Sequence, residues 1–186
     1  MRASFELDHA KLAHDPRFAE LTKNLAALSP IDSNEAFNRY CREACRLWPG
    51  GIGETSEQFT KLLDRIEHTN DGVIRTSWGG VAITLHEPPR VEKYLVVRRG
   101  GYLALEMHEQ KDERLDVTEG AGLILWRRPN ERAITVEVVR PKAQFHFQPG
   151  MEHCIIGTED LLVFERSIDP KGMDQDLIFI YQPDAS

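Results

Sequence analysis

The sequence predicts a mainly β domain that follows a helical segment. From about Gly72 onward, short runs rich in β-branched and aromatic residues alternate with Gly and Pro turn signals. Many short strands at regular spacing indicate an antiparallel sandwich or barrel. Before Gly72, apolar residues recur at helical spacing instead. We therefore expect residues 1–70 to form a helical segment packed on the barrel, and residues 71–186 to form the β-barrel domain.

About three helices are predicted in the first segment. Each begins with residues suited to a helix start, because a side-chain oxygen can accept from free backbone N–H groups and Pro lacks an N–H to satisfy. These starts are Asp15 with Pro16, Asp32 with Glu35, and Thr55 with Gln58. Apolar residues follow each start at helical spacing, so each helix is expected to turn one side towards a core. The stripes are Phe18, Leu21, Leu25 and Leu28, then Phe37, Tyr40, Cys41, Ala44 and Leu47, then Phe59, Leu62, Leu63 and Ile66.

Nine strand runs are predicted after the helices, separated by turn signals such as Gly79-Gly80, Pro88-Pro89 and Pro149-Gly150. The runs are Gly72–Ser77, Gly80–Leu85, Lys93–Arg98, Tyr102–His108, Gly122–Arg127, Ala133–Val139, Gln144–Phe147, Leu161–Glu165 and Leu177–Tyr181.

Composition and charge narrow the class of protein. Hydrophobic residues make up 41% of the chain and charged residues 28%, as in ordinary globular proteins. The formal net charge of −7 argues against a nucleic-acid partner, because phosphate contacts need clustered Lys and Arg. The basic run Arg98–Gly101 has the look of an RNA-binding fragment, but its two Gly residues favour a hairpin turn. We expect no nucleic-acid partner.

The chain also lacks membrane and secretion signals. No stretch reaches the roughly 18 apolar residues of a membrane span, and the first residues are too acidic for a secretory signal. Its three cysteines, Cys41, Cys45 and Cys154, are odd in number and have no CxxC spacing, which fits reduced thiols better than disulfides. We expect a cytoplasmic protein with no membrane partner.

Residues with the chemistry of a metal site occur between Gly101 and Gly120 and again at His153. His108 and Gln110 are two apart on a predicted strand, so both side chains are expected on one face. Glu113 follows near a bend into the next strand. Imidazole, amide oxygen and carboxylate together suit Mn, Fe or Zn, and a small barrel can bring them together. Alternatively, the histidines line the barrel and bond to each other or to water, and Glu113 is a surface charge.

Two further residues are candidates for catalysis. Glu106 is two residues before His108, so it is expected to share the inward face and can act as a general base. Lys111 can bind an acidic or hydroxylated substrate. The alternatives are that a bulge turns Glu106 outward and that Lys111 is a solvated residue at the end of a strand.

The same residues resemble the two sequence motifs of the cupin superfamily. In the first motif a Gly precedes His-x-His, a Glu and a second Gly, and in the second motif Pro-x-Gly-x-x-His ends on a metal-binding His. The matching residues are Gly101, His108, Gln110, Glu113, Gly120, Gly150 and His153. The resemblance covers roughly Lys93 to Tyr181. This chain departs from the motifs at Gln110, which replaces a His, at Gln148, which replaces the Pro, and at Gly157, which replaces an Asn.

The resemblance implies a cupin-like double-stranded β-barrel, also called a jelly roll, with a divalent metal held by His108, Gln110, Glu113 and His153. The likeness is to cupins of the mannose-6-phosphate isomerase and lyxose isomerase types. It therefore implies an enzyme that isomerises a small sugar or sugar phosphate, with Glu106 or Lys111 moving the proton. An iron-dependent dioxygenase and a non-catalytic, small-molecule-binding cupin are the alternatives. A homodimer is expected, because partners commonly cover the open sheet edges of small barrels.

Overall fold

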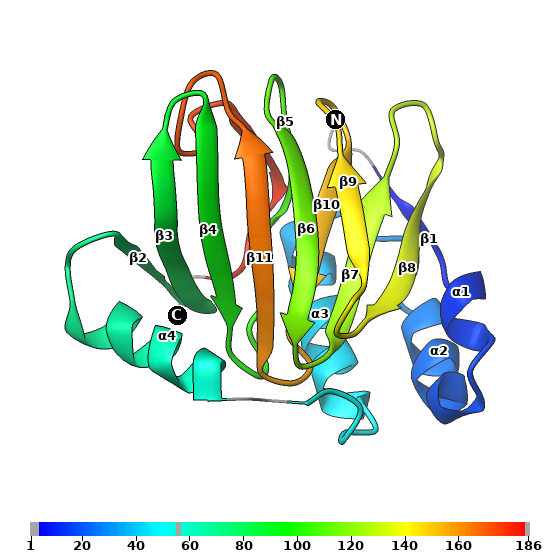
Figure 1. Ribbon diagram of the computed structural model, residues 1–186. Helices are drawn as coiled ribbons and strands as arrows, with labels where there is room; N and C mark the ends of the chain where they lie inside the picture. The colour runs from blue at the N-terminus through cyan, green and yellow to red at the C-terminus, as the bar shows by residue number, and fades with distance from the viewer. Residues whose placement is uncertain (1–3, 55–56, 185–186) are drawn as a thin grey trace.

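The protein is a sandwich of two six-stranded sheets with helices on its outside (Figure 1). The computed structural model describes residues 4–54 and 57–184. In the first sheet the order is β1 (Glu6–Asp8), β8 (Ala133–Val139), β7 (Gly122–Arg127), β10 (Glu152–Ile156), β5 (Leu105–His108) and β12 (Leu177–Tyr181). In the second it is β2 (Val73–Thr76), β3 (Gly79–Glu87), β4 (Arg90–Val97), β11 (Leu161–Ile168), β6 (Asp112–Glu119) and β9 (Gln144–Phe147). All pairs are antiparallel except β1 with β8. The prediction of a mainly β jelly roll is confirmed.

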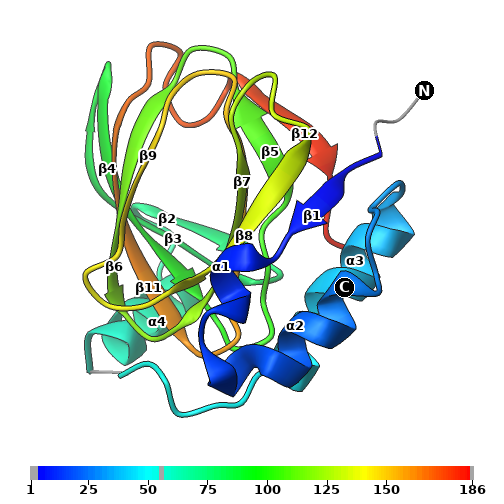
Figure 2. The same ribbon diagram turned by 90° about the vertical axis from the view of Figure 1, so that its right-hand side faces the viewer.

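The helices cover the outer faces of the two sheets (Figure 2). They are α1 (Ala10–Ala13), a short 3-10 helix (Pro16–Phe18), α2 (Ala19–Ala26), α3 (Asn34–Leu47) and α4 (Glu57–His68). The elements α1 to α3 pack on the first sheet, whereas α4 packs on the second sheet over β2, β3 and β4. None of these described helices is long and apolar enough to cross a membrane.

Of the two predicted helix starts that lie within the described residues, one is where it was predicted and the other is shifted by one residue. Asp15 caps the 3-10 helix that begins at Pro16, and its carboxylate accepts from the backbone N–H of Arg17. The helix α3 is capped by Ser33 and not by Asp32, because the Ser33 hydroxyl accepts from the backbone N–H of Ala36. Hydroxyl and carboxylate caps have similar strength, so the sequence alone does not choose between neighbouring candidates. The start predicted at Thr55 lies outside the described residues.

Four predicted strands have the observed bounds, and they are β7, β8, β9 and β12. Three strands were not predicted, namely β1, β6 and β10. The predicted hairpin at Arg98–Gly101 is wrong, because β4 before it belongs to the second sheet and β5 after it to the first. Gly100 does turn the chain with a positive φ of 86°, but the turn connects the two sheets.

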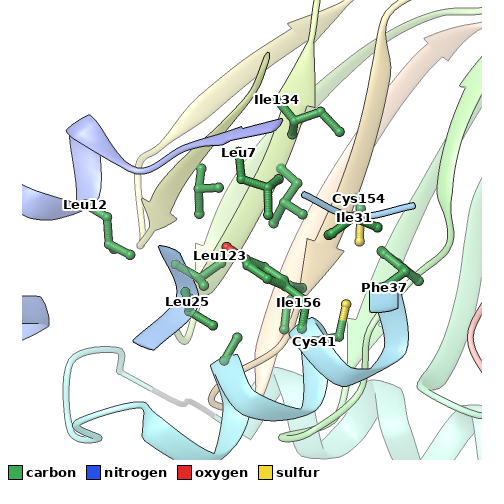
Figure 3. Packing of buried hydrophobic residues seen from close by; sticks show 14 of the residues in the cluster. Leu7, Leu12, Leu25, Ile31, Phe37, Cys41, Leu123, Ile134, Cys154 and Ile156 are labelled. Carbon is green, nitrogen blue, oxygen red and sulfur yellow. The ribbon is translucent and has the colours of Figure 1, made fainter. Parts of the chain in front are cut away.

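Three hydrophobic clusters hold the described layers together, one of them between α4 and the second sheet. The outer core lies between the first sheet and the helices, where Leu25, Phe37 and Cys41 meet Leu123 and Ile156 (Figure 3). The inner core lies between the two sheets and includes Leu95, Leu115 and Ile155. Because the helical segment shares a core with the sheet, it is an integral layer of the domain.

The motif glycine Gly120 ends β6 in a conformation that a larger residue would strain. Its φ is +75°, and a Cβ there would overlap the backbone carbonyl of Asp160. Only glycine meets both demands without a shift of the backbone. This fixes the turn from β6 into β7 and, with it, the register of the strand that carries Glu113.

Candidate metal centre

The centre is built on two neighbouring strands of the first sheet. Glu106 on β5 lies directly opposite His153 on β10, and directly opposite residues of an antiparallel pair share a face. His108 is two residues after Glu106 on the same strand, so it shares that face as well. One ligand atom each of Glu106, His108 and His153 lies within 4.8 Å of the others. This is a geometry in which three side chains can contact one ion.

The second sheet contributes charged residues that face this group. Lys93 on β4 is paired in register with Glu165 on β11, and Glu113 lies near the start of β6. All three are almost fully buried, with exposed fractions of 3% or less. Charges buried to this degree need ionic partners, and here they pair with one another and with Lys111.

Lys111 is the central cation of the cluster. Its ammonium group lies 2.6 Å from Glu113, 2.7 Å from Glu165 and 2.7 Å from Asp174. Burial alone would lower the pKa of Lys111, but the three carboxylates hold that pKa well above its usual value. Lys111 is therefore a fixed positive charge at neutral pH, and not the solvated strand-end residue that the sequence left open.

The loop between β11 and β12 closes the centre with two aspartates. The Asp174 carboxylate accepts from Lys111 and also pairs with Lys93, and despite its burial these ammonium groups lower its pKa to about 2. The Asp176 carboxylate accepts from the backbone N–H groups of Gln110 and Lys111. These bonds fix the turn from β5 into β6.

Asp176 also orients the imidazole ring of His108. The Nδ1 atom of His108 lies 2.9 Å from Asp176 Oδ1, so an Nδ1–H donates to the carboxylate. In the neutral ring, Nε2 then carries the lone pair, and it lies 3.5 Å from the Lys111 ammonium. A carboxylate behind a histidine in this manner is the usual support of a metal-binding imidazole.

Glu113 joins the two histidines. One of its oxygens lies 2.7 Å from His153 Nε2, and the other lies 4.0 Å from His108 Nε2. Burial would raise the pKa of Glu113, but Lys111 and His153 hold it well below its usual value. Burial likewise would lower the pKa of His153, yet the Glu113 carboxylate raises it. The pair behaves as carboxylate and imidazolium in the absence of an ion.

Glu106 differs from the other carboxylates because its pKa rises. Burial raises that pKa to about 7, and the nearby charge of Glu113 adds to the effect, although His153 and Lys111 oppose it. Among the described residues, no ammonium or guanidinium group is paired with Glu106. A carboxyl group with this pKa can gain and lose a proton near neutral pH.

The residues present fit a divalent metal ion. Two imidazoles and two carboxylates are ligands that Mn, Fe and Zn accept. Glu106, Glu113, Glu165, Asp174 and Asp176 contribute five carboxylates to the cluster, whereas Lys93 and Lys111 contribute two ammonium groups. The carboxylates therefore outnumber the ammonium groups, and an added cation would be favoured here.

The structure does not bring Gln110 to this group. β5 ends at His108, so the alternation of faces stops there, and Gln110 lies exposed in the following turn. Glu106, on the other side of His108, shares the inward face instead. His146 is exposed and pairs with Asp112, away from the centre.

Sequence reasoning missed four charged residues of the cluster, which are Lys93, Glu165, Asp174 and Asp176. Lys93 and Glu165 each stand at a buried position two residues after a buried Val of the same strand, and this interruption was the available signal. The two aspartates lie in a loop with no regular period, so no pattern could place them.

A cavity of about 690 Å³ opens beside the centre. Residues of the charged cluster, among them Glu106, Lys111, Glu113 and His153, line one part of it. Apolar residues of both sheets and a few polar residues, such as Thr76 and Gln182, line the rest. Its size is within the usual range of roughly 300–1,000 Å³ for small-molecule sites. The charged cluster is therefore open to a small molecule.

Comparison with known proteins finds likeness in structure only. No protein-family model matches the sequence, and no curated protein matches it either. Among solved structures, the capsular polysaccharide assembling protein CapF from Staphylococcus aureus matches with a TM-score of 0.52 and 20% identity. The match covers 59% of this chain and 34% of that one.

A mutant of Bacillus subtilis oxalate decarboxylase OxdC also matches, with a TM-score of 0.50 and 15% identity over 62% of this chain and 31% of that one. The matched region thus spans only about a third of either relative's length. At these identities the likeness concerns the fold alone. The two packed sheets and these matches together show that this chain has the cupin fold, a double-stranded β-helix.

Proposed function

We propose that this chain is a divalent-metal-binding enzyme that moves a proton on a small oxygenated molecule, specifically as an aldose–ketose isomerase of a small sugar or sugar phosphate. The observation that carries the proposal is the convergence of Glu106, His108 and His153 beside an open cavity. The motif resemblance to sugar isomerases supplies the specific reaction. Fold alone would not supply it, since one fold hosts many chemistries.

In this proposal His108, Glu113 and His153 hold the ion. Their contacts of 2.7 and 4.0 Å place nitrogen and oxygen donors around one point. An ion bound there would supply a Lewis acid for two adjacent oxygens of the substrate. Lys111 keeps Glu113 ionised and in place, and Asp176 orients the His108 ring through its contact with Nδ1.

Glu106 is assigned the proton transfer. It lines the cavity, and a pKa of about 7 allows both its ionised and its protonated form near neutral pH. As carboxylate it removes the proton from C2 of an aldose and, as carboxylic acid, returns it to C1, while the hydroxyl proton moves from O2 to O1. Lys111 is less suited to this task, because its raised pKa keeps it protonated.

The test is an isomerisation assay in D₂O with a panel of aldoses and their phosphates, in the presence of Mn or Zn. NMR follows formation of the ketose and uptake of deuterium next to the carbonyl. We expect both with the native protein and with His146→Ala, whose histidine is at the surface, and neither with His153→Ala. No equilibration of any sugar with either metal would refute the isomerase assignment.

A non-catalytic binding cupin is the second candidate, and the position of Lys111 favours it. The ammonium group already neutralises carboxylates within 2.6 to 2.7 Å, next to the nitrogen that would bind metal. The Lys111 ammonium group can thus take the place of a metal ion. Calorimetric titration with Mn, Fe(II) and Zn distinguishes the two candidates, since the binding cupin predicts no stoichiometric uptake of metal.

We also propose a homodimer. The strands β2 and β12 are edges of their sheets, and a second copy of the chain commonly covers such open edges. Sedimentation velocity at micromolar concentration is the test. A single species with the mass of one chain would refute it.

A further inference from the structure

The cavity continues from the charged cluster into an apolar chamber, and we infer that the substrate carries an apolar arm behind its oxygenated head. The substrate class is then a small sugar that carries an alkyl or aryl substituent, with the α-hydroxycarbonyl group as its head. This inference rests on the proposed function, which accounts for the oxygenated head of the substrate, and adds the apolar arm. A bare sugar would leave the apolar walls without a partner, although apolar burial is the main source of affinity in such sites.

The walls of the chamber are apolar on both sheets. They are formed by Trp78, Val81, Leu95, Leu103, Leu115 and Ile155. Of these, Leu95, Leu115 and Ile155 are nearly fully buried, with exposed fractions of 6%, 2% and 3%. The chamber is thus a part of the inner core that side chains leave unfilled.

The strand registers explain how the polar and apolar parts follow each other. On three strands, a charged residue of the cluster is followed two positions later by an apolar residue on the same face. The pairs are Lys93 and Leu95 on β4, Glu113 and Leu115 on β6, and His153 and Ile155 on β10. Two residues of strand advance about 7 Å. A molecule with its head at the cluster therefore reaches apolar walls within a few bonds.

The exposed part of the lining includes two apolar residues beside polar ones such as Ser77, Gln182 and Asp184. Phe179 on β12 lies opposite Glu106 in the β12–β5 register, lines the cavity and is 51% exposed. Ile74 on β2, also a lining residue, is 43% exposed. A second copy of the chain could cover these two side chains but could not fill the interior behind them. A ligand arm can do both, and this favours a small molecule as the occupant.

The experiment compares two chelating acids that share one head. Acetohydroxamic and hexanohydroxamic acid have the same pair of oxygens and differ by four methylene groups. Both are titrated calorimetrically into the Zn-loaded native protein, Phe179→Ser and Ile178→Ser. Ile178 precedes Phe179 on β12 and is 36% exposed. It is not among the residues that line the cavity, so its variant is a matched control. Thermal melting verifies that both variants fold.

We expect the longer acid to bind at least tenfold more tightly to the native protein and to Ile178→Ser, since each buried methylene is worth up to about fourfold. In Phe179→Ser the gain should shrink at least threefold. Equal affinities for the two acids in a protein that binds Zn and acetohydroxamate would overturn the inference and leave the proposed function standing.

Failure of the proposed function has a different result, namely no uptake of Zn. The two acids are then titrated into the Zn-free protein, where a tenfold preference for the longer acid supports the apolar arm and its absence overturns it. Sedimentation of the same variants completes the test. If Phe179→Ser dissociates a dimer while the chain-length gain is unchanged, Phe179 serves subunit contact and the inference is wrong.

Discussion

Lys111 shows how one buried residue can hold a charged cluster together. Its ammonium group is 2% exposed and contacts Glu113, Glu165 and Asp174. Replacing it by the similarly long Met leaves three buried carboxylates without their main partner. We expect Lys111→Met to lower the free energy of unfolding by about 3–5 kcal/mol at pH 7 in metal-free protein. Chemical denaturation measures the change.

The deficit of Lys111→Met should shrink with acid. The pKa of Glu113 is depressed in the folded protein, so its pairing stabilises above the pKa of the unfolded chain and is lost as the pH falls. The matched control is Lys171→Met, a partly exposed lysine whose nearest carboxylate, that of Glu109, is 3.8 Å away. Equal stability of the two variants at pH 7 would contradict the central role of Lys111.

Glu106 has the opposite dependence on pH. Its pKa of about 7 in the folded protein exceeds the ordinary 4.5, so the folded state binds more protons between these values and stability falls as the pH rises through them. In metal-free protein, Glu106→Gln should therefore be stabilising by on the order of 2 kcal/mol at pH 8 and nearly neutral at pH 4.5. Melting curves at both pH values are the measurement. The exposed Glu109→Gln is the control, and a Glu106→Gln effect that does not depend on pH would contradict the shifted pKa.

At the scale of elements, the loop between β11 and β12 positions the imidazole of His108. Asp176 accepts from Nδ1–H of His108 and from two backbone N–H groups at the start of β6. Asp176→Asn would weaken all three bonds. We expect it to lower the affinity for Zn about 10- to 100-fold, as loss of a supporting carboxylate typically does. Calorimetry measures this, with the exposed Asp64→Asn on α4 as control; unchanged affinity would show that the loop has no part in metal binding.

Elements also show what the sequence could and could not predict. The apolar stripes of α2 and α3 and the strands β7, β8, β9 and β12 follow regular periods, and their prediction is confirmed. The strand β6 was not predicted, because acidic residues, Glu113 and Glu119, occupy two of its buried positions and break the alternation of apolar and polar residues. Buried acidic residues thus interrupt the pattern that marks a strand.

The residues of the candidate site could likewise be predicted only in part. The motif spacing pointed to His108, Glu113 and His153, which the structure brings together. It also pointed to Gln110, which stands at the place of a motif His, but the chain turns after His108 and leaves Gln110 exposed. Asp174 and Asp176 come from a loop whose path depends on bonds to residues more than 60 positions earlier. No local pattern contains that information.

At the scale of the whole molecule, the helical segment and the barrel form one folding unit. Phe37 on α3 is fully buried and packs against Tyr102 and against Tyr181 of β12. The Glu159 carboxylate accepts from Trp48 and from two backbone N–H groups, of Ile52 and Gly53, and so ties the segment to the barrel a second time. These contacts predict a single cooperative transition.

Phe37→Ala is the test of that unity. It should lower the free energy of unfolding of the entire protein by about 3–5 kcal/mol, since a large buried side chain is lost from a shared core. Urea denaturation is followed by tryptophan fluorescence and by far-ultraviolet circular dichroism, with the exposed Arg39→Ala as control. Two separate transitions, or a loss below about 1 kcal/mol, would indicate that the helices fold independently of the barrel.

The most direct test of the account is metal stoichiometry, measured by elemental mass spectrometry after incubation with Mn, Fe(II) or Zn and removal of free ions. The native protein, Gln110→Ala and His146→Ala should each retain about one ion per chain, because Gln110 and His146 are exposed. His108→Ala and His153→Ala should retain none, because each loses an imidazole of the group. Absence of metal from the native protein, or equal metal in all five proteins, would contradict the claim that this cluster is a metal centre.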